Sequence, residues 1–210
     1  VDNHGGISRV VDCQPDFLLD IEAIGAAINA KTKAVIINSP NNPSGQIYPE
    51  ENLRALGELL EARSMTLQRT LYLLSDEPYR KIVFDGHRVP SIFKAYANSI
   101  VATSYSKDLS IPGERIGYAA VNPAAPHRKE IMAGMALATR ILGFVNAPAV
   151  MQQVISKVQG FSVDIEVYHR KRELLCQGLA AAGYEFIKPL GTFYLFPKTP
   201  IEDDVAFVQA

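Results

Sequence analysis

Up to Pro126, short runs of apolar and β-branched residues alternate with amphipathic helical patterns. This alternation limits the fold more than any other feature of the chain, because strands separated by helices pair most readily in a parallel sheet. The runs are mainly apolar and do not alternate with polar residues, as a sheet covered by helices on both faces requires. The sequence therefore predicts an α/β fold with a mostly parallel sheet covered by helices on both faces. The expected strands are 7–11, 34–38, 71–74, 81–84, 99–103 and 116–121, of which 81–84 and 116–121 are the expected departures from parallel order.

Two helices are predicted between these strands. In 20–30, apolar residues recur at helical spacing, and Asp20 is placed to act as the N-cap. In 50–65, leucines form one stripe and acidic residues crowd the first turn, where they complement the helix dipole. The first part of the chain therefore opens with a β-α-β pattern.

Beyond Pro126 the pattern becomes mainly helical, with short strands near the end. The expected elements are helices over 127–142, 148–159 and 162–182, strands over 185–188 and 193–196, and a helix that starts in 201–204. We predict that 1–168 form the major part of a large domain. The remainder, 169–210, would hold the end of a linking helix and the first part of a small α+β domain.

Composition excludes several classes of function. The 21 basic and 22 acidic side chains give a net charge of −1, which offers no electrostatic basis for binding nucleic acid or a membrane surface. No apolar run approaches the length that crosses a bilayer, and we expect a cytoplasmic protein. Two distant cysteines and four scattered histidines predict neither a disulfide framework nor a metal site.

Two polar motifs follow predicted strands, at the edge where open α/β sheets place their ligands. The first, 38–45, contains two prolines and a glycine, so a rigid turn could aim the amide of Asn41 or Asn42. The alternative is a plain helix-entry turn. The second, 75–79, places Asp76 at the end of a buried strand, where a carboxylate needs a protonated partner. A helix cap is the alternative there.

A third motif, 104–108, follows the predicted strand 99–103 and contains Lys107. The lysine lies among small hydroxylated residues, and Arg115 comes eight positions later. Such a setting suits an amine nucleophile beside an anion pocket, although a solvated loop lysine remains the alternative.

Taken together, the three motifs resemble those of the class I and II aminotransferases, which are enzymes of the aspartate aminotransferase fold that use pyridoxal 5'-phosphate. The matching residues are NNPSG at 41–45, DEPY at 76–79, SYSK at 104–107 with Arg115, and the run 189–194. The resemblance implies amino acid and 2-oxo acid substrates and a homodimer when full length. Family enzymes are nearly twice as long, so we expect residues 1–210 alone to turn over no substrate.

The resemblance also implies a role for each site residue. Lys107 would be the catalytic residue, forming the aldimine with the cofactor aldehyde and then carrying the substrate proton. Asp76 would pair with the pyridine nitrogen, while Asn42 and Tyr79 would hydrogen-bond the phenolic oxygen. The phosphate would be held by Ser104 and Arg115, with Ser106 as a weaker candidate, and the Asn42–Pro43 bond would be cis.

Three alternatives remain open. A pyridoxal-phosphate lyase or decarboxylase of the same fold would keep the same lysine, aspartate and phosphate ligands. A non-catalytic, aminotransferase-like effector domain of a transcriptional regulator would keep the cofactor site beside a DNA-binding module. An acyl-enzyme reading of Ser104 and Lys107 as an SxxK motif lacks its partner SDN and KTG elements.

Overall fold

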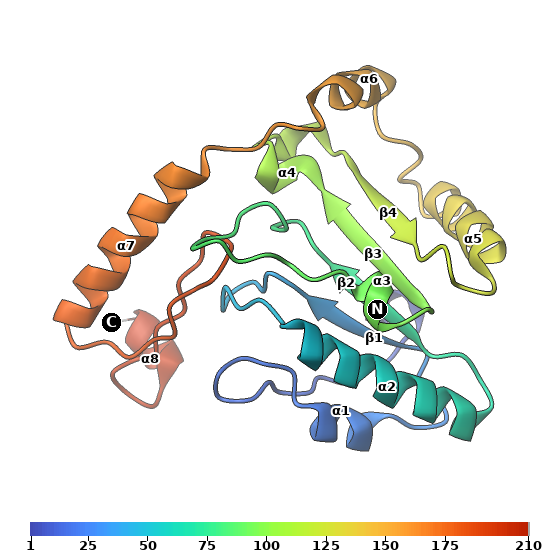
Figure 1. Cartoon of the computed structure of the whole chain (residues 1–210), viewed down its shortest axis with the longest axis horizontal. Helices are drawn as coiled ribbons and strands as arrows, with labels where there is room; N and C mark the ends of the chain where they lie inside the picture. The colour runs from blue at the N-terminus through green and yellow to red at the C-terminus, as the bar shows by residue number, and fades with distance from the viewer. Residues whose placement is uncertain (210) are drawn as a thin grey trace.

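In residues 1–209, the part of the chain that the computed structural model describes, four strands form one sheet in the order β1-β2-β3-β4 (Figure 1). The strands are β1 (Ala34–Asn38), β2 (Tyr72–Asp76), β3 (Ser99–Ser104) and β4 (Gly117–Val121). The pairs β1–β2 and β2–β3 are parallel, whereas β4 runs antiparallel to β3. The predicted α/β class, with a mostly parallel sheet flanked by helices, is confirmed, and so is the departure from parallel order at 116–121.

Four predicted strands are wrong. Residues 7–11 form no strand, and Ile7 and Val10 are 92% and 86% exposed. Residues 81–84 leave the sheet: Val83 forms a single bridge to Gly191, while Ile82 and Phe84 are buried in a separate cluster. In 185–188 and 193–196 the described structure likewise has no strand, and only an isolated bridge from Phe186 to Pro197 remains nearby.

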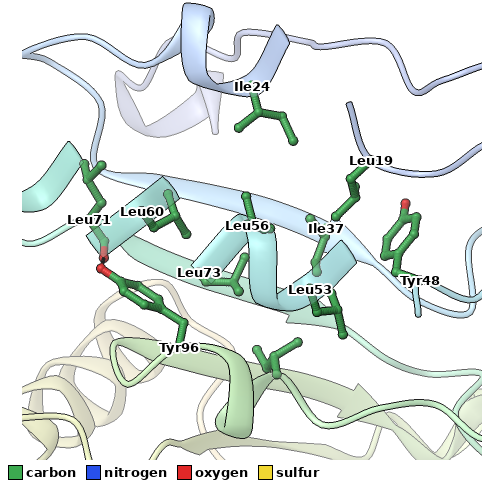
Figure 2. Packing of buried hydrophobic residues seen from close by; sticks show 11 residues of the cluster. Leu19, Ile24, Ile37, Tyr48, Leu53, Leu56, Leu60, Leu71, Leu73 and Tyr96 are labelled. Atoms are coloured by element: carbon green, nitrogen blue, oxygen red, sulfur yellow. Dashed lines mark hydrogen bonds between the residues drawn. The ribbon is translucent and has the colours of Figure 1, made fainter. Parts of the chain in front are cut away.

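Three helices are packed around the buried part of the sheet. They are α1 (Ile21–Ala27), α2 (Glu50–Leu67) and the unpredicted short α3 (Ile92–Ala95). Asp20 caps α1 as predicted, since its carboxylate accepts a hydrogen bond of 2.9 Å from Ala23 N. The leucine stripe of α2 contributes Leu56 and Leu60, both 0% exposed, to the core drawn in Figure 2.

The two faces of the sheet differ in burial. Side chains alternate along a strand, so Ile37 and Leu73 lie in the core while their neighbours on the other face do not. On that other face Ile36 is 60% exposed, and Asp76 and Ala102, which are register partners, are exposed as well. Asp76 therefore lies at the carboxyl end of β2 on the accessible side of the sheet.

The remaining helices are α4 (Tyr105–Asp108), α5 (Arg128–Ile141), α6 (Ala149–Val158), α7 (Ile165–Ala181) and α8 (Asp204–Gln209), with 3₁₀ turns at Asp2–His4 and Pro112–Glu114. Of these, α5 to α8 match the sequence predictions within a few residues, whereas α4 and the two 3₁₀ turns were not predicted. Figure 1 shows α5 beside β4, and α7 on the opposite side of the molecule, followed by the segment that returns toward the sheet. Helix α4 is a single turn that directly follows β3.

Two helical glycines predict opposite effects of the same substitution. A Cβ at Gly57 of α2 would lie 2.1 Å from the Ala95 carbonyl oxygen of α3, whereas a Cβ at Gly134 of α5 would meet nothing within 4 Å. We expect Gly57→Ala to destabilise the protein by about 1–3 kcal/mol through overpacking. The control, Gly134→Ala, should be neutral or stabilising by up to about 1 kcal/mol, because alanine favours a helix. Urea unfolding followed by circular dichroism measures both, and equal effects would contradict the close approach of α2 and α3.

Candidate active site

The ends of three strands bring the predicted motifs to one edge of the sheet. Parallel register pairs Asn38 with Asp76, and Asp76 with Ala102, two residues before Ser104. Asn38 Nδ2 also donates a 2.8 Å hydrogen bond to the Asp76 backbone oxygen. The first two motifs are thus tied together where β1 and β2 end.

The first motif is a rigid turn in which the two asparagines do different work. Asn41 Oδ1 accepts hydrogen bonds from the Ser44 amide and hydroxyl, at 3.2 and 2.8 Å, so Asn41 stabilises the turn itself. Asn42 donates its backbone N–H to Asn38 Oδ1 at 2.6 Å, and its side chain reaches Tyr79. Of the two amides, Asn42 is therefore the one presented to the site. The Asn42–Pro43 bond is cis, as predicted, and so is Ser39–Pro40.

The second motif supplies an acid and a phenol. Desolvation by the surrounding chain raises the pKa of Asp76, although the residue as a whole remains exposed. Within residues 1–209 no basic side chain forms an ion pair with this carboxyl. Tyr79 is 3% exposed, and burial, followed by its hydrogen bond to Tyr194, raises its pKa, while Asn42 acts in the opposite direction. Tyr79 therefore keeps its proton at neutral pH and can donate it.

Lys107 of the third motif lies beside this phenol. Its Nζ is 5.9 Å from the centre of the Tyr79 ring and 5.6 Å from that of Phe193. The part of the chain that the structure describes offers Nζ neither a carboxylate nor a hydrogen-bond acceptor. The amine therefore lies beside two aromatic rings and forms no ion pair with the described residues.

Hydroxyl groups and a guanidinium flank the lysine. Ser104 is the N-cap residue of α4 and Ser106 lies within that turn. Ser104 pairs with Gly117 in the sheet, which places Arg115, two residues before Gly117, next to the same strand end. Arg115 has a left-handed backbone with φ of 51°, is exposed, and donates to the Pro112 carbonyl at 2.8 Å. Hydroxyls and a guanidinium fork are suited to an anion.

The structure adds Tyr194 and Phe193, to which the sequence analysis assigned no role. The Tyr194 hydroxyl lies 2.9 Å from that of Tyr79, and the Phe193 ring meets the Tyr79 ring edge-on at 5.4 Å. Both belong to the run 189–194 that carries part of the family resemblance. That run was the only signal in the sequence, and it does not reveal which side chain reaches the site.

The described residues 1–209 contain neither a metal-binding cluster nor a membrane-spanning helix. Histidine, cysteine, aspartate and glutamate side chains do not gather there in a group of three that could hold a metal ion. Nor does any helix in that range have the length and apolar character needed to cross a membrane.

Comparison with known proteins identifies the family. The family model described as "Aminotransferase class I and II" matches residues 2–210. A probable aspartate/prephenate aminotransferase from Thermus aquaticus is 33% identical over 93% of this chain, and the aspartate/prephenate aminotransferase of Thermus thermophilus is 32% identical over 95%. The alignments cover 50% and 51% of those two proteins, so the chain spans about half the length of the curated relatives it matches.

Solved structures agree with the sequence comparisons. An aminotransferase from Eubacterium rectale superposes with a TM-score of 0.92 at 46% identity, over 95% of this chain and 50% of its own. Thermus thermophilus aspartate aminotransferase superposes with a TM-score of 0.77 at 28% identity, over 97% and 53%. On the family model, these relatives and the shared fold, the chain belongs to the class I and II aminotransferases.

Proposed function

We propose that this chain carries the cofactor-binding part of a pyridoxal-phosphate-dependent aminotransferase, which moves an amino group from an amino acid to a 2-oxo acid. The family uses this cofactor. The observation that carries the proposal is the meeting of Lys107 with Tyr79, Asn42 and Asp76 at one sheet edge. Because the chain spans half the length of its relatives, the activity proposed is that of the whole protein.

Lys107 is the catalytic residue of this proposal. Pyridoxal phosphate, when bound, supplies an aldehyde that condenses with amines and a cationic ring that withdraws electrons from the substrate Cα. Lys107 Nζ, which makes no ion pair in the described residues, would bond to that aldehyde and, once the substrate amine takes its place, would accept the proton from Cα. Lys107 acts first as a nucleophile and then as a general base.

Asp76 fits the ring nitrogen of the cofactor. A desolvated carboxyl without a cationic partner in 1–209 is an incomplete ion pair, and a protonated pyridine nitrogen would complete it. The pairing would lower the pKa of Asp76 and raise that of the nitrogen. In this role, Asp76 would keep a proton on the ring nitrogen when the cofactor is bound.

The other site residues orient the cofactor. Asn42 and the protonated hydroxyl of Tyr79, which are neighbours in the structure, would donate to its phenolic oxygen and so stabilise the anionic form. Ser104 and Arg115, assisted by Ser106, would hold the phosphate with hydroxyl and guanidinium donors. Together these residues would hold the cofactor next to Asp76 and Lys107.

Further proposals concern the whole protein. A homodimer is supported by the exposed apolar side chains of α5 and the loop after it, among them Met132, Leu137 and Phe144, at 59%, 60% and 79% exposure. We also propose that 1–168 belong to a large domain, that 169–210 begin a small domain, and that the protein is cytoplasmic. Aspartate is the first amino donor to test, because the relatives are named for it.

A substrate panel tests the proposed reaction. The whole protein with pyridoxal phosphate, supplied with aspartate or aromatic amino acids and a 2-oxo acid, should form a new amino acid in equal amount to the new 2-oxo acid. Release of ammonia or carbon dioxide without that exchange would favour a lyase or a decarboxylase. Cofactor binding without turnover of any pair would favour the regulator alternative, and transamination by residues 1–210 alone would contradict the expected need for the rest of the protein.

A further inference from the structure

Tyr194 reaches the site from a segment 115 residues away in sequence. Its hydroxyl lies 2.9 Å from the Tyr79 hydroxyl, with the two rings edge-to-face at a centroid distance of 5.6 Å. The Tyr79–Tyr194 pair lies beside Lys107 Nζ, which is 5.9 Å from the Tyr79 ring. The contact therefore joins the segment 189–194 to the predicted cofactor site.

Backbone hydrogen bonds fix the segment that carries Tyr194. The N–H groups of Leu190 and Gly191 both donate to the Gly45 carbonyl at 3.0 Å, and Thr192 N donates to the Ile82 carbonyl at 2.9 Å. Gly45 allows this approach, since a Cβ there would lie 2.3 Å from Pro189 Cβ. The segment is thus fastened to the first motif and to the residues that follow the second.

A buried arginine fastens the same segment from α7. Arg172 is 5% exposed and donates from one terminal nitrogen to the Pro189 carbonyl at 2.9 Å, while the other pairs with Asp85 Oδ2 at 2.8 Å. A segment bound at three places holds its side chains in one geometry, which a functional hydroxyl requires.

We propose that Tyr194 is a positioning residue for the cofactor's phenolic oxygen: its hydroxyl donates to the Tyr79 oxygen and so directs the Tyr79 proton toward that oxygen. This inference rests on the proposed function, within which Tyr79 binds the phenolic oxygen. Tyr194 acts through Tyr79 and need not touch the cofactor.

In the chain alone either hydroxyl of the pair can donate, and the proposal is that the bound cofactor selects the arrangement in which Tyr194 donates. Each tyrosine hydroxyl has one proton to donate and can also accept, so Tyr79 can donate to only one acceptor at a time. If Tyr194 donates to Tyr79, the Tyr79 proton is free for the cofactor, and a hydroxyl that accepts a bond becomes a stronger donor. The groups that face Tyr79 are Asp76, Asn42, Lys107 and Tyr194, and burial keeps its proton in place by raising its pKa.

The visible absorption of the cofactor linked to Lys107 depends on the hydrogen bonds from Tyr194 to Tyr79 and from Tyr79 to the phenolic oxygen. Donation to the phenolic oxygen lowers the shared proton affinity of that oxygen and the adjacent imine nitrogen, so losing a donor raises the apparent pKa of the visible absorption band. In the whole protein loaded with pyridoxal phosphate, Tyr194→Phe should raise this apparent pKa by about 0.5 and Tyr79→Phe by about 1 or more. Both variants keep the ring and its packing.

A double-mutant cycle separates a positioning role from a structural one. If Tyr194 acts through Tyr79, adding Tyr194→Phe to Tyr79→Phe should change the apparent pKa no further. Tyr184→Phe is the matched control, because Tyr184 packs against Phe207 of α8 and should leave the titration unchanged. An unchanged pKa in Tyr194→Phe, or an equal shift in both backgrounds, would overturn the inference. Absence of any visible band in the unsubstituted protein would instead overturn the proposed function.

Discussion

Replacing Lys107 by alanine should remove the visible absorption of the cofactor-loaded protein and lower transamination by about 10⁴-fold or more, since this substitution deletes both the nucleophile and the general base. No second lysine in residues 1–209 takes its place beside the Tyr79 ring. Absorption spectra and single-turnover rates on the whole protein measure the two effects. The cofactor itself should still bind, because its phosphate and ring contacts come from other residues.

The control for this experiment is Lys31→Ala, which removes an exposed lysine side chain from the turn before β1, at the opposite end of that strand from the proposed site. It should leave both the spectrum and the rate unchanged. A Lys107→Ala protein that keeps its visible band and its rate would refute the assignment of the catalytic lysine. Circular dichroism of both variants shows whether either change disturbs the fold.

The parallel part of the sheet was predictable because its signals are local. The strands 34–38, 71–74 and 99–103 are mainly apolar, and the helix that begins at Glu50 carries a continuous leucine stripe. Asp20 likewise caps α1 through contacts within three residues. Such patterns depend only on neighbouring residues, so they can be recognised without knowledge of the tertiary structure.

The strands that were predicted wrongly show that an apolar run does not determine the hydrogen-bond partners of its backbone. Residues 81–84 are apolar because Ile82 and Phe84 are buried, but their backbone groups bond to Thr192 and Leu190 and not to the sheet. Apolar character predicts burial, whereas the hydrogen-bond partner depends on which distant segment arrives there. In 7–11 the described structure pairs the backbone with no other strand, and residues 7–10 are exposed while only Val11 packs against the core.

In the candidate site, too, some contacts could be predicted from the sequence and others could not. Asn42, Asp76, Tyr79 and Lys107 follow consecutive parallel strands, so their meeting at one edge could be inferred from the strand order alone. The contact between Tyr79 and Tyr194 could not, because it requires the chain to return after α7 and dock on Gly45 and Ile82. Long-range packing, which leaves no periodic signal in the sequence, completes this part of the site.

Asp76→Asn should lower the rate of transamination by about 10²–10³-fold with little change in stability, since the amide keeps the shape of the side chain but not its charge. A neutral amide cannot hold a proton on the ring nitrogen, so the ring loses its cationic form at neutral pH. The deficit should grow as pH rises, because solvent alone must then protonate the nitrogen. Rates measured across a pH series test this directly.

Two comparisons isolate the role of the charge. Glu61→Gln makes the same carboxylate-to-amide change on the exposed side of α2 and should leave the rate and its pH profile unaltered. A cofactor analogue methylated at the ring nitrogen is cationic without a proton, so it should restore much of the activity of Asp76→Asn. If the analogue gave no recovery and the deficit were independent of pH, the carboxylate of Asp76 would have to act elsewhere than at the ring nitrogen. Recovery with the analogue would instead show that Asp76 contributes a negative charge at the ring and not only a hydrogen-bond geometry.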